Sequence, residues 1–207
     1  MKKRLLSALL CAAMLLLSLP AAFAASDLDG HWAKKYIDYL ADEDIINPSA
    51  TTGKYSPDAK VTRAEFMRYI NRAFHFEETA SITYTDVPKS AWYYETVCIA
   101  QKYGYINGVG NNKMDPTGTV TREQAATIIG RLYKADPGSV SASSLDFKDK
   151  AKISSWSAGY IKAAVDKGFL AGYSDGTFQP TREVTRGEVA KIIYYYLGTS
   201  LSRAGKA

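Results

Sequence analysis

The feature that most constrains this chain is a unit that occurs three times along it. Each copy has a tryptophan, an aliphatic residue fourteen positions later, and then a proline followed five residues on by a Thr-Arg pair. The tryptophans are Trp32, Trp92 and Trp156, and the pairs begin at Thr62, Thr121 and Thr185. Repeated short units cannot bury a core alone, so they stack on one another. The fold is therefore expected to consist of three similar pieces.

Each copy predicts a helix, a loop and a second helix. Apolar residues recur five and eight positions after each tryptophan, which is the spacing of one helical face. Thr-x-x-Glu/Gln, a capping box, begins the second helix in every copy. Asp44, Gly104 and Gly168 stand twelve positions after the tryptophans and tolerate the left-handed conformation that ends a helix. We expect an all-α fold in which the units pack around an approximate three-fold axis.

The first 24 residues are predicted to be a secretory signal peptide. Positive charges at residues 2–4 precede an apolar run over residues 5–17 and the cleavage pattern Ala22-Phe23-Ala24. The run is shorter than the roughly 20 residues of a membrane span, and no second run follows, so we expect an exported chain without a transmembrane segment. Residues 2–4 also supply three of the five net positive charges, which leaves little support for a nucleic-acid partner. The predicted boundaries are 1–24 for the signal peptide, 25–76 for repeat 1, 84–135 for repeat 2 and 147–198 for repeat 3.

After cleavage Cys98 is the one remaining cysteine, so no intramolecular disulfide is expected. Its place on the first helix of repeat 2 predicts a partly exposed thiol.

An arginine follows the capping threonine in every copy, where the helix dipole disfavours a cation by about 0.3–1 kcal/mol. These residues are Arg63, Arg122 and Arg186. In one interpretation the stem packs on tryptophan while the charge lies in water or pairs with Asp27, Asp86 or Asp149. In the other, the guanidinium binds an anion. These two interpretations of the arginine are compatible with each other. The tryptophans are either core anchors of the first helix or exposed surfaces that stack on a sugar ring.

The loop between the helices is glycine-rich in repeat 3, where it runs from Leu170 to Pro180. Such a loop beside an arginine lets a ligand approach the backbone closely. Repeat 2 keeps a weaker version that includes Gly108, and repeat 1 has Pro48 in place of the first glycine. If all three repeats bind a ligand, repeat 1 is expected to bind it least well.

These motifs together resemble the S-layer homology domain in three tandem copies. The resemblance rests on Asp-aliphatic, the tryptophan, Gly-Tyr-x-Asp-Gly-x-Phe-x-Pro, and Val-Thr-Arg-Ala/Gly-Glu. It implies an all-helical pseudo-trimer with one helix per repeat in a central bundle and with grooves between repeats. It also implies non-covalent attachment to the cell wall, at the cell surface, through a secondary cell-wall polysaccharide. The terminal N-acetylmannosamine of that polymer often carries a pyruvyl ketal, which offers a carboxylate to arginine and a sugar face to tryptophan.

The resemblance assigns glycan binding to one set of residues in each repeat and implies no cofactor. They are Asp27, Trp32 and Arg63 in repeat 1, Asp86, Trp92, Gly108 and Arg122 in repeat 2, and Asp149, Trp156, Gly172, Tyr173, Ser174 and Arg186 in repeat 3.

A catalytic function is not favoured. Residues 172–176 spell Gly-x-Ser-x-Gly, but no buried strand precedes them, no helix follows directly and no histidine lies downstream. His31 and His75 do not have the spacing of zinc ligands. We therefore expect an anchor without a catalytic domain. Two alternatives stay open: a structural or adaptor protein that contacts surface-layer proteins, and a tether to peptidoglycan.

Overall fold

The computed structural model describes residues 26–204, so the predicted signal peptide lies outside the described residues. The described chain is helical, with isolated β-bridges and no strands. Its α-helices are α2 (Lys34–Asp42), α3 (Arg63–Ala73), α4 (Tyr94–Tyr103), α5 (Arg122–Leu132), α6 (Ala158–Asp166) and α7 (Arg186–Ala204), with 3-10 turns η1 (Ala142–Ser144) and η2 (Lys150–Lys152). Within residues 26–204 no helix is both long and apolar enough to cross a membrane. The all-α prediction is confirmed.

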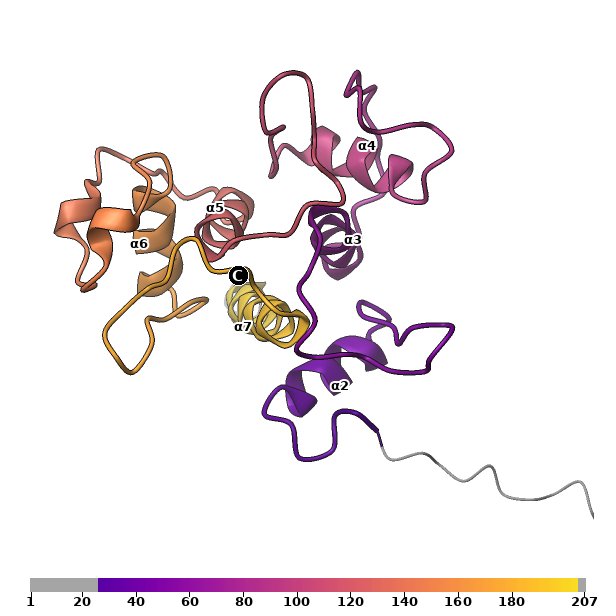
Figure 1. Cartoon of the computed structure of the whole chain (residues 1–207), viewed down its shortest axis with the longest axis horizontal. Helices are drawn as coiled ribbons and strands as arrows, with labels where there is room; N and C mark the ends of the chain where they lie inside the picture. The colour runs from indigo at the N-terminus through magenta and orange to yellow at the C-terminus, as the bar shows by residue number, and fades with distance from the viewer. Residues whose placement is uncertain (1–25, 205–207) are drawn as a thin grey trace, which may run out of the picture.

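The second helix of each repeat lies at the centre of the molecule and the first helix lies outside it. Figure 1 shows α3, α5 and α7 as the inner helices, with α4, α6 and α2 as three surrounding lobes. Each outer helix packs on the inner helix of the preceding repeat: α4 on α3, α6 on α5, and α2 on α7. The last helix therefore closes on the first, which confirms the predicted pseudo-three-fold trimer around a central bundle.

A ring of three valines joins the repeats where the inner helices begin. The backbone N–H of Val61 donates to the carbonyl of Val184 (3.2 Å), Val184 to Val120 (2.9 Å), and Val120 to Val61 (3.1 Å). All three side chains are fully buried. Buried backbone groups need partners, and here each repeat supplies the partner for another. The ring places the starts of the three inner helices at the same end of the bundle.

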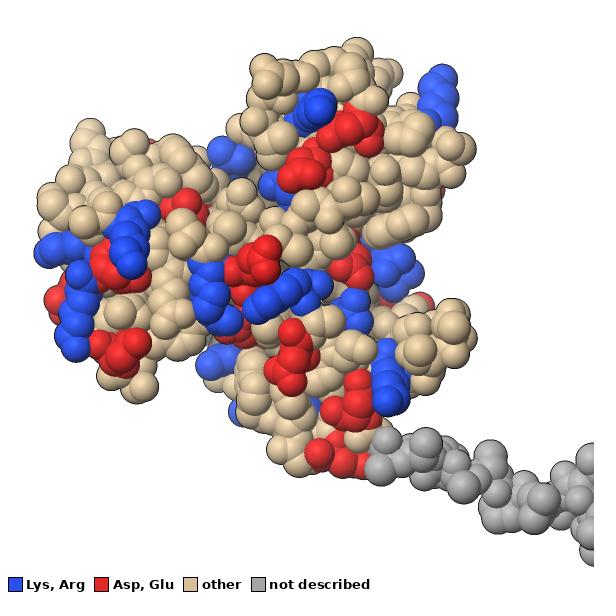
Figure 2. Space-filling view, viewed as in Figure 1, with Lys and Arg blue, Asp and Glu red and all other residues tan. Residues whose placement is uncertain are grey.

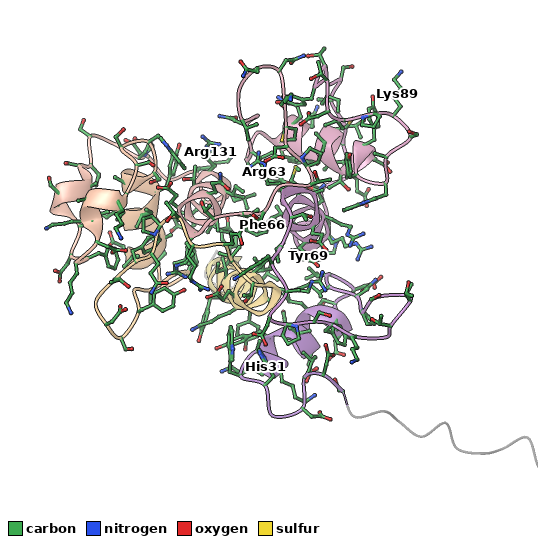
Figure 3. All side chains as sticks on the ribbon, viewed as in Figure 1. His31, Arg63, Phe66, Tyr69, Lys89 and Arg131 are labelled. Atoms are coloured by element: carbon green, nitrogen blue, oxygen red, sulfur yellow. The ribbon has the colours of Figure 1, made fainter. Side chains whose placement is uncertain are left out.

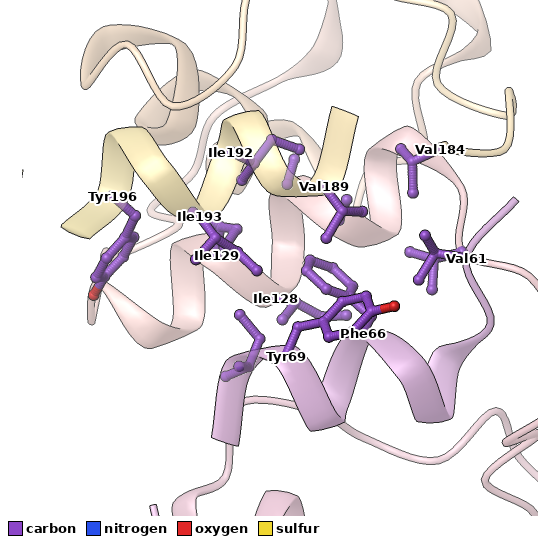
Figure 4. Packing of buried hydrophobic residues seen from close by; sticks show 14 of the residues in the cluster. Val61, Phe66, Tyr69, Ile128, Ile129, Val184, Val189, Ile192, Ile193 and Tyr196 are labelled. Carbon is purple, nitrogen blue, oxygen red and sulfur yellow. The ribbon is translucent and has the colours of Figure 1, made fainter. Parts of the chain in front are cut away.

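Apolar side chains of the inner helices fill the space between them (Figure 4). Phe66 on α3, Ile129 on α5 and Ile193 on α7 are fully buried. The outer helices are buried at the predicted positions, which are Ile37, Leu40, Val97, Ala100, Ile161 and Ala164. The two helical stripes of each repeat thus join one continuous core.

The local signals that were expected to begin and end helices are present in all three repeats. Thr62 and Glu65 form a reciprocal capping box, as do Thr121 with Gln124 and Thr185 with Glu188. The residues expected to be left-handed have positive φ angles, namely Asp44 (58°), Gly104 (68°) and Gly168 (72°).

Two sequence-based interpretations are wrong. The tryptophans are not core anchors, because Trp32, Trp92 and Trp156 are 51%, 55% and 51% exposed. Cys98 is not partly exposed but buried. The segment between repeats 1 and 2 contacts α4, the helix that carries Cys98, where the N–H of Ala80 donates to the carbonyl of Cys98 (3.1 Å).

Candidate functional site

The side chains of two of the repeated arginines extend into the loop of the next repeat and donate hydrogen bonds to its carbonyl groups. Arg63 is the first residue of α3, and its Nε donates to the carbonyl of Met114 (2.9 Å) and its Nη2 to that of Asn107 (2.9 Å). Arg122 donates in the same way to Phe178 (2.8 Å) and Ala171 (2.8 Å). Both residues are 4% exposed. The carbonyl dipoles of the loop therefore take the place of water around a buried charge.

The repeated aspartates hold the same loops from the other side. Asp86 accepts from the N–H of Met114 (2.9 Å), the residue whose carbonyl accepts from Arg63. Asp149 accepts from Phe178 (2.8 Å), whose carbonyl accepts from Arg122. The aspartate thus accepts from the backbone N–H of one loop residue while the arginine donates to the carbonyl of the same residue, an arrangement that we call the clasp. Among the ion pairs of the described residues, these arginines and aspartates do not pair directly with each other.

Repeat 1 carries the same clasp on its own loop. Asp27 accepts from the N–H groups of Tyr55 (3.0 Å) and Ser56 (2.6 Å). Arg186 donates through Nη1 to the carbonyl of Tyr55 (2.7 Å). The position of Asp27, Asp86 and Asp149 in all three repeats is therefore explained by the anchoring of a loop.

The pKa values of these groups follow from burial and from hydrogen bonding. Desolvation lowers the pKa of Arg63 against the attraction of Asp115, although the guanidinium stays charged because arginine side chains are not deprotonated in proteins. Desolvation raises the pKa of Asp27, but the donating N–H groups of Ser56 and Tyr55 outweigh it, so the net shift is downward. The pKa of Asp86 is lowered by the same balance.

A groove lies beside Arg63, which we call the α5 groove. Its cavity is about 410 Å³. The lining residues come from three repeats: Arg63 from repeat 1, the loop and α5 from repeat 2, and Trp156 from repeat 3. They are Arg63, Ile106, Asn107, Gly108, Val109, Gln124, Thr127, Ile128, Arg131 and Trp156. Arg63 and Arg131 both lie beside the repeat 2 lobe in Figure 3.

The α7 groove is the equivalent site one repeat further on, with a cavity of about 570 Å³. Arg122 comes from repeat 2, the loop and α7 from repeat 3, and Trp32 from repeat 1. Its lining residues are Trp32, Arg122, Gly168, Phe169, Leu170, Ala171, Gly172, Tyr173, Glu188, Lys191, Ile192 and Tyr195. Closure of the ring of repeats therefore completes this groove.

One NH₂ group of each groove arginine stays available to a ligand. Within residues 26–204, Nη1 of Arg63 and Nη1 of Arg122 make no hydrogen bond, while Nε and Nη2 are both engaged. Neither Nη1 atom is among the buried atoms without partners. Each groove thus combines a cationic donor, held in place by its loop, with a half-exposed indole.

Aromatic residues fix the arginine of the α7 groove. The Cζ atom of Arg122 lies 4.5 Å from the ring centre of Tyr173 and 4.8 Å from that of Phe178. The hydroxyl of Tyr173 donates to Glu188 (3.1 Å), which also pairs with Arg182. Desolvation raises the pKa of Tyr173, although Arg122 opposes the rise, so this phenol is protonated at neutral pH.

The two loop glycines are required by close packing. A Cβ atom on Gly108 would lie 2.6 Å from the carbonyl oxygen of Lys113, and one on Gly172 would lie 2.7 Å from the ring of Phe147. The loop can therefore lie close beneath the groove only with glycine at these positions.

The third interface between repeats, which we call the α3 interface, is built differently. Nη2 of Arg186 donates to Glu65 (2.8 Å), so both of its NH₂ groups have partners. The Cζ atom of Arg68 lies 4.6 Å from the ring centre of Trp92, over one face of this indole, which is still 55% exposed. A cavity of about 510 Å³ exists nearby between α3 and α4, but neither Trp92 nor Arg186 lines it.

The structure therefore regroups the residues predicted from the sequence. Arg63 and Gly108 meet Trp156, whereas Arg122, Gly172 and Tyr173 meet Trp32. The aspartates lie behind the loops, and Ser174 is exposed at the turn without lining either groove.

Sequence reasoning missed the groove faces of the inner helices. These are Gln124, Thr127 and Arg131 on α5, and Glu188, Lys191 and Tyr195 on α7. They recur at i, i+3 and i+7 on the side opposite the apolar stripe, so the polar face of the second helix was the available signal. In the face shown in Figure 2 the two signs of charge are interspersed, so the field that a ligand meets is set by these local groups.

Comparison with known proteins agrees with this architecture. The family model described as S-layer homology domain matches residues 26–67, 83–126 and 146–190, which together make up more than half of the chain. The chain is 33% identical over 178 residues to an amylopullulanase of Thermoanaerobacterium thermosulfurigenes, covering 84% of this chain and 10% of that protein. It is 37% identical over 94 residues to a cellulosome-anchoring protein of Acetivibrio thermocellus, covering 45% of this chain and 21% of that protein.

A surface-layer 125 kDa protein of Lysinibacillus sphaericus is 26% identical over 165 residues, covering 78% of this chain and 14% of that protein. The chain thus spans about a fifth or less of the length of each of these relatives.

Proposed function

Because the chain belongs to the S-layer homology domain family, we propose that it anchors a protein at the cell surface by binding an acidic cell-wall polysaccharide in its α5 and α7 grooves. Domains of this family anchor proteins to the cell surface, and this is the location of the chain. The ligand we propose is the terminal sugar of a secondary cell-wall polysaccharide, an N-acetylmannosamine that carries a pyruvyl ketal.

The observation that carries the proposal is the pairing of a guanidinium NH₂ group with an exposed indole in each groove. The ketal carboxylate would accept from Nη1 of Arg63 or Arg122, a charge-assisted bond that is stronger than a neutral one. The apolar face of the sugar would lie against Trp156 or Trp32, each about half exposed. The arginine is already ordered by its loop, so little entropy would be lost on binding.

The same grooves argue against a catalytic role for this part of the protein. The matched family is an anchoring module, and the amylopullulanase aligns with the chain over 10% of its own length. The Gly-x-Ser-x-Gly segment forms the turn beside the α7 groove, where the N–H of Tyr173 donates to the carbonyl of Thr177 (2.8 Å). We assign binding, not hydrolysis, to this turn.

A wall-binding assay tests the proposal. The chain is sedimented with purified cell-wall sacculi, before and after acid extraction of the secondary polymer. We expect the double variant Trp32→Ala with Trp156→Ala to lose at least about tenfold in affinity, since a buried aromatic contact contributes on the order of 1.5 kcal/mol per site.

Trp92→Ala is the matched control, because this tryptophan is equally exposed but lines neither groove. It should bind like the unmodified chain. Equal binding by all three proteins would overturn the proposal. Retention on stripped sacculi would indicate a peptidoglycan tether, and binding to neither preparation would favour a role in contacting other proteins.

A further inference from the structure

Among the inner-helix positions at which the two grooves differ, one carries an aromatic ring in one groove and a charge in the other. The residue nine positions after the repeated arginine is Arg72 on α3, Arg131 on α5 and Tyr195 on α7. Arg131 lines the α5 groove and Tyr195 lines the α7 groove. Only in the α7 groove, therefore, does an aromatic ring stand at this position.

Tyr195 continues an aromatic row that begins at Trp32. The ring centres of Trp32 and Tyr36 are 6.3 Å apart, and those of Tyr36 and Tyr195 are 5.9 Å apart. Tyr36 is buried, and its hydroxyl lies 3.4 Å from that of Tyr195. Trp32 and Tyr195 are 51% and 39% exposed. Tyr36 therefore fixes two exposed rings on one wall of the groove, with their centres no more than about 12 Å apart.

The α5 groove has a charged group where the α7 groove has this second ring. There Arg131 stands at the corresponding position, and its Cζ atom lies 5.6 Å from the ring centre of Tyr160. The cavity is also smaller, about 410 Å³ against about 570 Å³. A neutral sugar could stack on Tyr195 but would meet a guanidinium in the α5 groove.

We propose that the α7 groove contains a second sugar subsite, in which Tyr195 stacks on the neutral sugar that precedes the terminal acidic one. This inference rests on the proposed function, because Trp32 and Arg122 are taken to hold the terminal sugar. Lys191, one helical turn before Tyr195, lines the same wall and supplies a hydrogen-bond donor for the hydroxyl groups of the second sugar. The α7 groove therefore recognises a disaccharide, and the α5 groove recognises the terminal sugar alone.

The test compares two probes in two single-groove backgrounds. The probes are the ketal-bearing N-acetylmannosamine and a disaccharide in which a neutral N-acetylhexosamine is attached to it. Trp156→Ala leaves the α7 groove intact, and Trp32→Ala leaves the α5 groove intact. By calorimetric titration we expect the disaccharide to bind at least about fivefold tighter than the monosaccharide in the Trp156→Ala background, and equally in the Trp32→Ala background.

Substitutions at position 195 then locate the subsite. In the Trp156→Ala background, Tyr195→Ala should abolish the preference for the disaccharide over the monosaccharide, whereas Tyr195→Phe should keep this preference because it keeps the ring. A preference that survives Tyr195→Ala overturns the subsite while the proposed function stands. If neither probe binds the unmodified chain, both the subsite and the proposed function are overturned.

Discussion

The α7 groove and the α3 interface are built from corresponding elements of different repeats, but their side chains make different contacts. Each receives an arginine from the preceding repeat and a tryptophan from the following one. In the α7 groove Arg122 keeps a free NH₂ group and Trp32 keeps an open face. In the α3 interface Glu65 accepts a hydrogen bond from the second NH₂ group of Arg186, and Arg68 lies over one ring face of Trp92, although this indole is as exposed as that of Trp32. Both inner helices carry a glutamate at this position, but Glu65 pairs with the entering Arg186, whereas Glu188 pairs with Tyr173 and Arg182. The partner of this glutamate therefore decides whether the entering arginine stays available to a ligand.

The guanidinium nitrogens of the groove arginines divide into those that stabilise the fold and one that remains for a ligand. Nε and Nη2 of Arg63 and Arg122 donate to loop carbonyls, and the third nitrogen, Nη1, makes no hydrogen bond within residues 26–204. The structural and the ligand-binding interpretations of the repeated arginine therefore describe different atoms of one guanidinium.

The largest effect is expected from Arg122→Ala, which removes the buried group that ties repeat 2 to the loop of repeat 3. Two hydrogen bonds from a charged donor are lost, and the unfolding free energy should fall by about 3 kcal/mol. Urea unfolding followed by circular dichroism measures this. Arg68→Ala is the control, because Arg68 makes no hydrogen bond within the described residues, and it should cost less than about 1 kcal/mol. Equal losses for the two variants would contradict the structural role of Arg122.

An intermediate effect is expected from opening the α3 interface. The double variant Glu65→Gln with Arg68→Thr introduces the side chains that stand at positions 124 and 127 of α5. Gln124 keeps a capping box in repeat 2, so the helix start should survive. The variant frees Arg186 and removes the guanidinium from the face of Trp92, and the number of monosaccharides bound per chain should rise from two to three by native mass spectrometry. A number that stays at two would show that Pro48 or the loop of repeat 1 closes this interface instead.

The smallest effect is a loss of stability in acid. The pKa of Asp86 is lowered in the folded chain, so its carboxylate stabilises the fold above its ordinary pKa of about 4 and ceases to do so as the pH falls below that value. Asp86→Asn should unfold more easily than the unmodified chain at pH 7 and by a smaller margin at pH 3. Asp42→Asn serves as a control at an exposed position. If Asp86→Asn and the unmodified chain show the same dependence of unfolding free energy on pH, the clasp is not the source of the acid sensitivity.

Most of the fold could be predicted because the signals that define it are local. The capping boxes, the left-handed residues at 44, 104 and 168, and the buried stripe that includes Ile37 and Leu40 each depend on neighbours within one or two helical turns. Repetition then indicated that the three units share one arrangement.

The composition of each groove could not be predicted, because it depends on which repeat packs on which. Periodicity identifies the buried face of a helix but not its neighbour, so it could not show that Arg63 meets Trp156. It also left open whether the tryptophans anchor the core; they precede the first helix and are about half exposed to solvent. The sequence did not indicate that Arg68 lies over Trp92, because a single arginine on the polar face of a helix is common and its neighbour in another repeat is not known from the sequence.

A crystal soaked with the ketal-bearing N-acetylmannosamine tests the central claim most directly. We predict one sugar in the α5 groove, with its carboxylate on Nη1 of Arg63 and its ring against Trp156, and one in the α7 groove on Arg122 and Trp32. We predict none on Trp92. Two empty grooves, or a sugar bound only on Trp92 beneath a displaced Arg68, would contradict the account.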